Sequence, residues 1–314
     1  MWSAQHSKTV PPMSSWRSLT PGRRRNLRNG LLFVSPWLAG FLCFTLFPFV
    51  ASLYFSFCDY DILSPPRWVG LANYRELVTD DPYFVKALYN TFYYTAFSVP
   101  LGILFGVGIA LLLNMKVVGV PVYRTLYYLP SIVPVVATSV LWMWLLNPQY
   151  GLINSLLGKL GLPEPGWISD PLWSKPSLIL MAMWAVGGSI VIYLAGLQGI
   201  PVELYEAAEL DGAGPWQRTR AVTLPLLSPV IFFNLVMGLI GALQVFTQAY
   251  VMTQGGPVDS TLFYSVYLFR RAFTYLDMGY ASAMAWLLFV VIMALTVFTF
   301  RSAARWVHYA GEGR

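Results

Sequence analysis

Charged residues are missing from six long stretches of this 314-residue chain. A helix that crosses the hydrocarbon of a membrane needs about 20 mostly apolar residues, and each stretch is long enough. A transmembrane β-barrel would instead show alternating segments of about ten residues. The apolar cores of the stretches lie near 31–56, 88–113, 123–146, 178–198, 227–251 and 280–300. The pattern therefore predicts an all-α membrane protein with six transmembrane helices.

Basic residues predict how these helices are oriented. The first span follows Arg23, Arg24, Arg25 and Arg28, and its apolar run exceeds the 7–15 residues or so of a cleaved signal peptide, so we interpret it as a retained helix. Six crossings from a cytoplasmic N-terminus place both termini in the cytoplasm, together with the segments 115–124 and 203–220. These inner segments hold 13 of the 20 Lys and Arg residues, whereas the outer loops hold 9 of the 14 acidic residues.

The ends of the chain differ in composition from its middle. Residues 1–28 combine Ser, Pro and Arg with few apolar residues, which predicts a disordered, basic cytoplasmic tail attracted to anionic lipid headgroups. Residues 29–301 form the expected transmembrane domain, with a cytoplasmic loop at 200–225. Residues 302–314 are expected to be a second cytoplasmic tail.

Overall composition agrees with a membrane location and excludes several function classes. Hydrophobic residues make up 57% of the chain and charged residues 11%, against roughly 25% charged in soluble domains. We attribute the net charge of +6 to membrane orientation and expect no nucleic-acid partner. Two cysteines, Cys43 and Cys58, and two histidines, His6 and His308, provide no spacing typical of a metal site.

The six spans contain no ionisable residue of the kind that pumps and ion-coupled carriers retain inside the membrane. This makes a proton-driven carrier less favoured, although sodium can bind neutral oxygens. The sequence contains no Walker A motif, and no Ser-His-Asp set has its acid and its histidine at membrane depth. Energy for transport would then have to come from another polypeptide.

Uncharged polar residues within the spans have two interpretations. Gln244 and Gln248 are four residues apart, so on a continuous helix they share a face and can hydrogen-bond the hydroxyl groups of a solute. Gly188 and Ser189 interrupt the fourth span and leave room for a ligand or for a neighbouring helix. Hydrogen bonding and close packing between helices explain the same residues.

The loop between the fourth and fifth spans predicts a short helix of about ten residues. Pro201 suits its first turn, Glu203 and Glu206 favour its N-terminal end, and Gly212 can adopt the left-handed conformation that ends it. A second helix is expected to begin at Pro215. The small side chains of the first helix fit a groove on a partner protein, but the helix could equally lie on the bilayer or on the chain's own bundle.

The same loop carries a spaced motif, formed by Glu206-Ala207-Ala208, Gly212, Val222 and Leu224-Pro225. It resembles the EAA signature of permease subunits of bacterial ABC importers: EAA, three residues, Gly, nine residues, Ile, one residue, Leu-Pro. Every spacing agrees, and Val222 stands where the family has Ile. Asp211 and Trp216, with further matching segments over residues 30–301, resemble the carbohydrate-uptake branch that includes maltose and glycerol-3-phosphate permeases.

This resemblance implies a fold, a set of partners and a mechanism. The fold would be the type I importer permease bundle, in the bacterial cytoplasmic (inner) membrane. A second permease subunit, forming a heterodimer, would complete the pore; an extracytoplasmic binding protein would deliver the solute; and a dimer of ATPase subunits would bind ATP and Mg²⁺. This chain would bind no cofactor or metal and would not itself be an enzyme. Lipid would surround it.

The resemblance also assigns roles to residues. The coupling element that docks on the ATPase would comprise Glu206, Ala207, Ala208, Asp211, Gly212, Leu224 and Pro225. A separate hypothesis assigns the substrate pathway to Gln244, Gln248, Ser189 and Gly188, with Trp184 offering its ring to a sugar.

A stand-alone secondary carrier remains the alternative, but such carriers commonly have two related halves, and none is evident here. The sequence leaves open which sugar or polyol is carried.

Overall fold

The computed structural model describes residues 21–115 and 118–308, and these divide after Tyr54 into two compact units. Within these ranges, four helices are long and apolar enough to cross a membrane alone, and two bent helix pairs raise the number to six. The predicted all-α, six-span architecture is therefore confirmed. The short strands β1 (Cys58–Asp59) and β2 (Arg67–Trp68) pair in an antiparallel hairpin.

The first unit is a long helix that contains the first predicted span. It contains α1 (Pro21–Phe41), the π-helical turn η2 (Leu42–Leu46) and all but the last residue of α2 (Phe47–Phe55), and none of these elements has a buried residue. The wide turn lies around Phe44, whose carbonyl would otherwise meet the ring of Pro48 four residues later. The described residues of this unit are thus exposed or at most half-buried.

The helix begins earlier than the sequence predicted. Residues 21–28 were expected to belong to a disordered tail, but they form the first turns of α1. Pro21 suits a first helical position, and each residue added to an existing helix gains a hydrogen bond. The rest of the expected tail, residues 1–20, lies outside the described residues. At the other end, residues 304–308 follow α15, and residues 309–314 also lie outside them.

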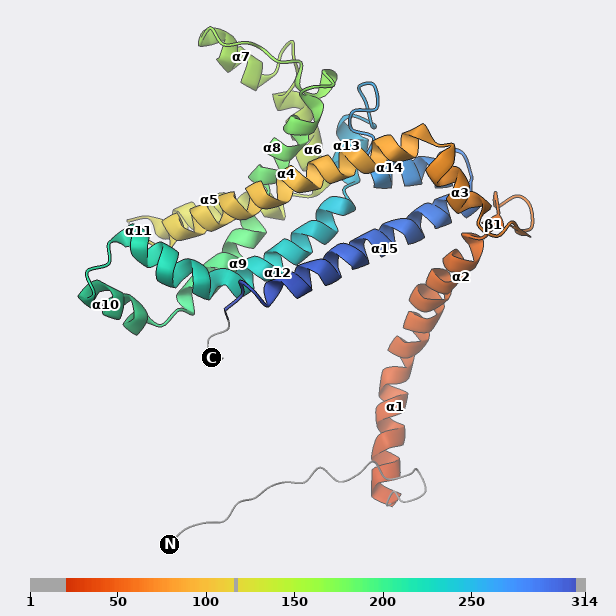
Figure 1. Ribbon diagram of the computed structural model, residues 1–314, viewed down its shortest axis with the longest axis horizontal. Coiled ribbons are helices and arrows are strands. Elements are labelled where there is room, and N and C mark those ends of the chain that lie inside the picture. The colour runs from red at the N-terminus through yellow and green to blue at the C-terminus, as the bar shows by residue number, and fades with distance from the viewer. Residues whose placement is uncertain (1–20, 116–117, 309–314) are drawn as a thin grey trace. The chain divides into compact units, whose positions relative to one another are not determined.

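The second unit is a helical bundle built around α4 (Pro82–Leu113), which packs against α8, α9, α12 and α14 (Figure 1). Its remaining elements follow in chain order: α3 (Ala72–Thr79), α5 (Val120–Ile132), α6 (Val135–Leu145), α7 (Leu152–Lys159), η3 (Trp167–Ser169), α8 (Ser174–Trp184), α9 (Gly187–Gln198), α10 (Val202–Leu210), α11 (Pro215–Arg218), η4 (Thr219–Thr223), α12 (Leu224–Leu243), α13 (Thr247–Met252), α14 (Tyr264–Phe269), η5 (Arg270–Thr274) and α15 (Met278–Ala303).

Two predicted spans are bent pairs of helices. In the third span, α5 and α6 meet at 101°. Val133 is extended there because the ring of Pro134 disfavours the helical conformation in the residue before it. In the fourth span, α8 and α9 meet at 46° across Ala185 and Val186. The sequence predicted the lengths of these spans but not the bends.

The bundle has two distinct ends. The hairpin β1–β2 and α3 lie at one end, and α10 and α11 lie at the other (Figure 1). Near the second end, Arg124 donates to the carbonyl of Leu113, and the amide of His308 donates to the hydroxyl of Ser228. Within this unit, the described parts of the inner segments predicted from charge, at 115–124, 203–220 and 302–308, therefore gather toward the same end.

Asp81 connects the first turn of α4 to α14 and α15. Its buried carboxylate caps α4 by accepting hydrogen bonds from the amides of Tyr83 and Phe84. It also accepts 2.5 Å bonds from the hydroxyls of Tyr267 and Tyr280, and it lies 3.4 Å from Arg271. Burial favours the neutral acid, but these donors and the Arg271 charge outweigh burial and hold the pKa of Asp81 below its ordinary value.

A close helix contact positions the bend of the fourth span. A side chain on Gly187 would place its Cβ 2.5 Å from the carbonyl oxygen of Tyr127 in α5, whereas a Cβ on Gly188 would meet no atom within 4 Å. Gly187 therefore lets α9 approach the backbone of α5, as close helix packing in membranes requires.

We predict that Gly187→Ala lowers the free energy of unfolding by about 1–3 kcal/mol, because the added methyl group must displace backbone atoms. Gly188→Ala, its neighbour in α9, is the control and should be neutral or slightly stabilising. Thermal unfolding of the two variants in the same detergent gives the comparison. Equal melting temperatures would show that the α5–α9 contact is not tight.

We predict that Asp81→Asn lowers the free energy of unfolding at neutral pH by about 2–4 kcal/mol, since it removes the charged acceptor shared by two tyrosines and Arg271. Because the folded pKa is lowered, the stabilisation is complete above the ordinary carboxyl value of 3.8 and is lost as the pH falls through the folded value. The difference in melting temperature between wild type and variant should therefore shrink in acid. Exposed Asp80→Asn should leave stability unchanged at every pH.

Candidate functional site

The predicted short helix in the loop between the fourth and fifth spans is present as α10. Pro201 is its N-cap residue and Glu203 lies in its first turn. At its end, the amides of Gly212 and Ala213 donate to the carbonyls of Glu209 and Ala208, which forms a Schellman motif. Gly212 has a φ of +79°, so the left-handed end predicted from sequence is confirmed. The second helix, α11, begins at Pro215 as expected.

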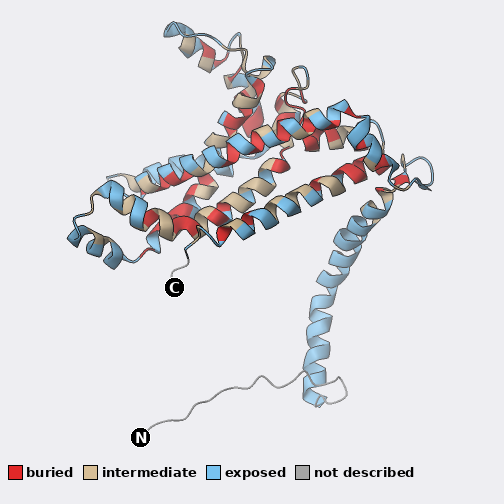
Figure 2. Ribbon diagram, viewed as in Figure 1, coloured by how far each residue is buried: buried red, intermediate tan, exposed pale blue. Residues whose placement is uncertain are grey.

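No residue of α10 is buried, and the helix is pale blue through most of its length in Figure 2. Glu206, Ala207, Asp211 and Gly212 are exposed, and Ala208 is half-buried. Leu210 is 90% exposed, an extreme value for a leucine. The part of the bundle that the structure describes therefore leaves the surface of α10 free. The structure therefore argues against the interpretation in which the helix lies on the chain's own bundle, and leaves a partner groove or the bilayer surface.

Polar contacts hold α10 to the segment that leads into the fifth span. The hydroxyls of Tyr205 and Thr223 lie 3.0 Å apart, and Arg218 forms an ion pair with Glu209. Leu224 and Pro225 begin α12 and are half-buried, with Leu224 packed against the bundle core. The motif thus has two parts. One is the exposed helix α10, and the other is the half-buried start of α12 at Leu224-Pro225, which packs in the bundle.

The two glutamines proposed for the substrate pathway do not lie on one continuous helix. α12 ends at Leu243, Gln244 is its C-cap residue, and α13 begins only at Thr247. The four-residue spacing therefore does not place Gln244 and Gln248 on a shared helical face, and the prediction of a shared face was wrong. Gln244 is exposed, whereas Gln248 is half-buried and its side chain lies at the buried hydroxyl of Tyr94 in α4.

Trp184 borders a cavity of about 510 Å³ that is formed by α4, α5, α6, α8 and α9. Its walls are largely apolar and aromatic. They include Phe105, Tyr123, Tyr127, Trp142 and Trp184, and the rings of Trp142 and Trp184 meet edge to face at 6.1 Å. The indole N–H of Trp142 is buried without a partner among the described residues. Of the predicted pathway residues, only Trp184 lines this cavity; Gly188 and Ser189 are half-buried on α9 nearby.

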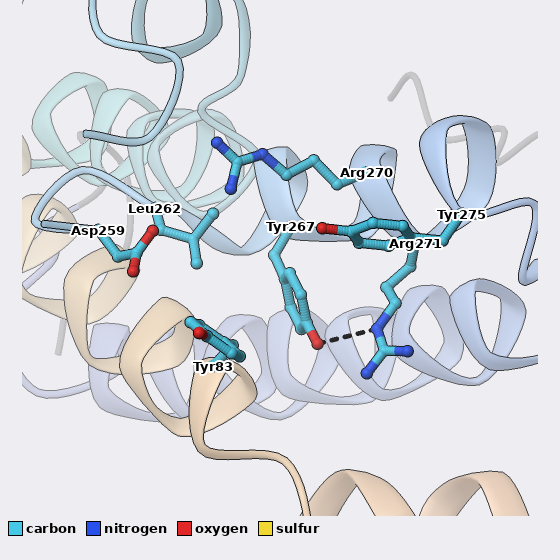
Figure 3. Close-up of a pocket in the computed structure, with 7 residues that line it drawn as sticks. All are labelled: Tyr83, Asp259, Leu262, Tyr267, Arg270, Arg271 and Tyr275. Atoms are coloured by element: carbon cyan, nitrogen blue, oxygen red, sulfur yellow. Dashed lines mark hydrogen bonds between the residues drawn. The ribbon is translucent and has the colours of Figure 1, made fainter. Parts of the chain in front are cut away.

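A second cavity, of about 420 Å³, was not anticipated from sequence. Its lining residues are Tyr83, Asp259, Leu262, Tyr267, Arg270, Arg271 and Tyr275. Figure 3 shows that the two arginines extend to different sides of Tyr267, with Arg271 donating to its hydroxyl. Arg271 forms ion pairs with Asp81 and Asp277, and Arg270 donates to the carbonyl of Gln254. The only local sequence signal was Asp81-Pro82, a typical helix start.

Comparison with known proteins identifies the family of the chain. Residues 98–308 match the family described as the binding-protein-dependent transport system inner membrane component. The probable ABC transporter permease protein YesP of Bacillus subtilis (strain 168) is 45% identical over 294 residues, which cover 92% of this chain and 94% of YesP. The sulfoquinovosyl glycerol transport system permease protein SmoG of Agrobacterium fabrum (strain C58) is 35% identical over 254 residues, covering 80% of this chain and 82% of SmoG.

A solved structure agrees with these relatives. One chain of the bacterial alginate ABC transporter, solved in complex with an alginate pentasaccharide-bound periplasmic protein, is similar to this chain. The TM-score is 0.78 at 26% sequence identity, over 90% of this chain and 96% of that one. The predictions of a multi-pass permease and of the importer-type bundle are therefore confirmed. The chain belongs to the binding-protein-dependent transport system inner membrane component family and is a permease subunit of an ABC importer.

Proposed function

We propose that this permease forms half of the pore through which a sugar, or a related polyol or glycerophosphate, enters the cell from an extracytoplasmic binding protein. The main support for the substrate class is the aromatic cavity at Trp184, because sugar rings stack on aromatic side chains. The names of the similar proteins, one for sulfoquinovosyl glycerol and one for alginate, agree with it. The individual sugar is left open.

Coupling to ATP is assigned to α10. An exposed helix that presents Glu206, Ala207 and Ala208 and ends at Gly212 suits insertion into a groove on an ATPase subunit. ATP and Mg²⁺ would be bound by the two ATPase subunits, whereas this chain would bind neither and catalyse no reaction. The contacts between Tyr205 and Thr223 and between Arg218 and Glu209 would then carry the motion of α10 into α12.

A second, different permease subunit would complete the pore. No residue of α5 is buried by this chain, although α5 borders the aromatic cavity. A partner bundle placed against α5 would close that side of the path. The end of the bundle that carries α10 would face the cytoplasm with both termini, in the bacterial cytoplasmic (inner) membrane, in agreement with the distribution of basic residues.

We predict that Gly212→Val abolishes both transport and solute-stimulated ATPase activity of the assembled complex while the protein still inserts. A branched side chain at φ +79° strains the end of α10 by roughly 1–2 kcal/mol and changes the docking surface. Gly161→Val is the matched control, since Gly161 also has a positive φ of +68° in open space but follows α7. The control should lose a similar amount of stability and keep its activity. Full ATPase stimulation in Gly212→Val would remove the docking role of α10.

We predict that Trp184→Ala raises the solute concentration needed for half-maximal uptake by about tenfold, which corresponds to roughly 1.4 kcal/mol and is expected for the loss of one stacking ring. The double variant Gln244→Ala, Gln248→Ala tests the remaining pathway residues in the same proteoliposome uptake assay. Phe298→Ala, an exposed aromatic residue on α15, is the control. Unchanged kinetics in the glutamine double variant would discard those two residues, and uptake without ATPase subunits would instead support a stand-alone carrier.

A further inference from the structure

Lys175, in the first turn of α8, lies near the end of α4 that begins at Pro82. Its ammonium group donates to Oδ1 of Asn90 at 3.1 Å and lies 5.7 Å from the ring centre of Tyr89 and 5.3 Å from that of Tyr93. Asn90 is buried and fixed, since its amide nitrogen donates to the carbonyls of Asp259 and Leu262. The position of the ammonium group is therefore set by the packing of α4 against α8.

The charge of Lys175 is not neutralised by the protein around it. Lys175 forms no ion pair with a carboxylate within the described ranges. The neighbouring Lys86, which repels it, donates to the carbonyl of Val258 and lies 3.9 Å from the carboxylate of Asp259. Asp259 thus pairs with Lys86 alone, which leaves the positive charge of Lys175 unpaired beside the exposed ring of Tyr89 and the half-buried ring of Tyr93. A site of this charge fits an anion.

The surface next to Lys175 is apolar along the rest of α4. Tyr89, Tyr93 and Phe97 follow one another at four-residue spacing, with ring centres of Tyr93 and Phe97 4.7 Å apart. Tyr89 is 62% exposed, and the exposed residues continue with Leu101 and Leu104 toward the other end of the helix. Among these stripe residues, only Tyr89 and Tyr93, next to Lys175, carry hydroxyl groups. This surface therefore has a cationic end with hydroxyl groups, at Lys175, Tyr89 and Tyr93, and continues as a row of apolar side chains along α4.

We propose that Lys175, Tyr89 and Tyr93 form a binding site for the headgroup phosphate of an anionic phospholipid, with an acyl chain lying along Phe97, Leu101 and Leu104. Tyrosines at the membrane interface suit a phospholipid headgroup, and an ammonium group attracts its phosphate. A sugar acid would match the charge of Lys175, but the apolar stripe offers no partners for its hydroxyl groups. The inference does not depend on ATPase coupling or on the transported solute.

Native mass spectrometry of the full-length chain, purified with its partner subunits, tests the site. Increasing phosphatidylglycerol is added to wild type and to Lys175→Gln, and phosphatidylcholine is added in parallel. We expect Lys175→Gln to bind one phosphatidylglycerol about tenfold more weakly, since it loses one charge-assisted hydrogen bond, and to bind phosphatidylcholine as wild type does. Lys175→Arg should retain phosphatidylglycerol. Lys159→Gln, at the exposed end of α7, should behave as wild type.

Three outcomes would overturn the proposal. Lys175→Gln and wild type, both monodisperse on gel filtration, could bind phosphatidylglycerol equally. Phosphatidylcholine could bind wild type as tightly as phosphatidylglycerol, which would leave no role for the headgroup charge. A uronate oligosaccharide could displace the bound lipid from wild type but not from Lys175→Gln, which would make the site a sugar subsite. If Lys175→Gln fails to fold, Tyr89→Ala together with Tyr93→Ala provides the second variant, with the same expected loss of phosphatidylglycerol.

Discussion

The hydrocarbon of the bilayer cannot hydrogen-bond to the backbone, and this constraint accounts for most of the structure. Helices satisfy their own amides and carbonyls, and α4 and α15 each continue as a single helix through the bundle, α4 even across Pro100. A broken helix is tolerated only where protein or a water-accessible cavity covers the break. Two of the breaks, at Val133-Pro134 and Ala185-Val186, belong to the helices that border the aromatic cavity at Trp184. The irregular backbone and the candidate solute path therefore coincide.

Local chemistry made part of this structure predictable from sequence. The six spans follow from the absence of charge, which needs no knowledge of tertiary contacts. The same holds for α10, because Pro201, Glu203 and Gly212 act on the backbone within a few residues of themselves. The EAA spacing then added a candidate role for this helix that its local physics alone left open.

Other features depend on contacts between distant parts of the chain and were not predictable. Asp81 meets Tyr267 and Tyr280 across more than 180 positions, and Lys175 meets Asn90 across 85. The break between α12 and α13, Gln244-Val245-Phe246, contains no proline or glycine, so periodicity suggested a continuous helix through Gln248. In the N-terminal segment, low apolar content suggested disorder, whereas growth of an adjoining helix extends order back to Pro21.

The same break determines how far a displacement at α10 can travel. The 20 residues of α12 form a rod about 30 Å long, held at its base by Tyr205 and ending at Gln244. Beyond that point the helix axis is interrupted, so a push along α12 would not pass in line into α13, and the interruption is itself packed in the bundle, with Leu243 and Val245 buried. On a rod of this length, a tilt of a few degrees at its base would displace the tip by roughly 1–2 Å, and the residues packed around Leu243 would have to move with it.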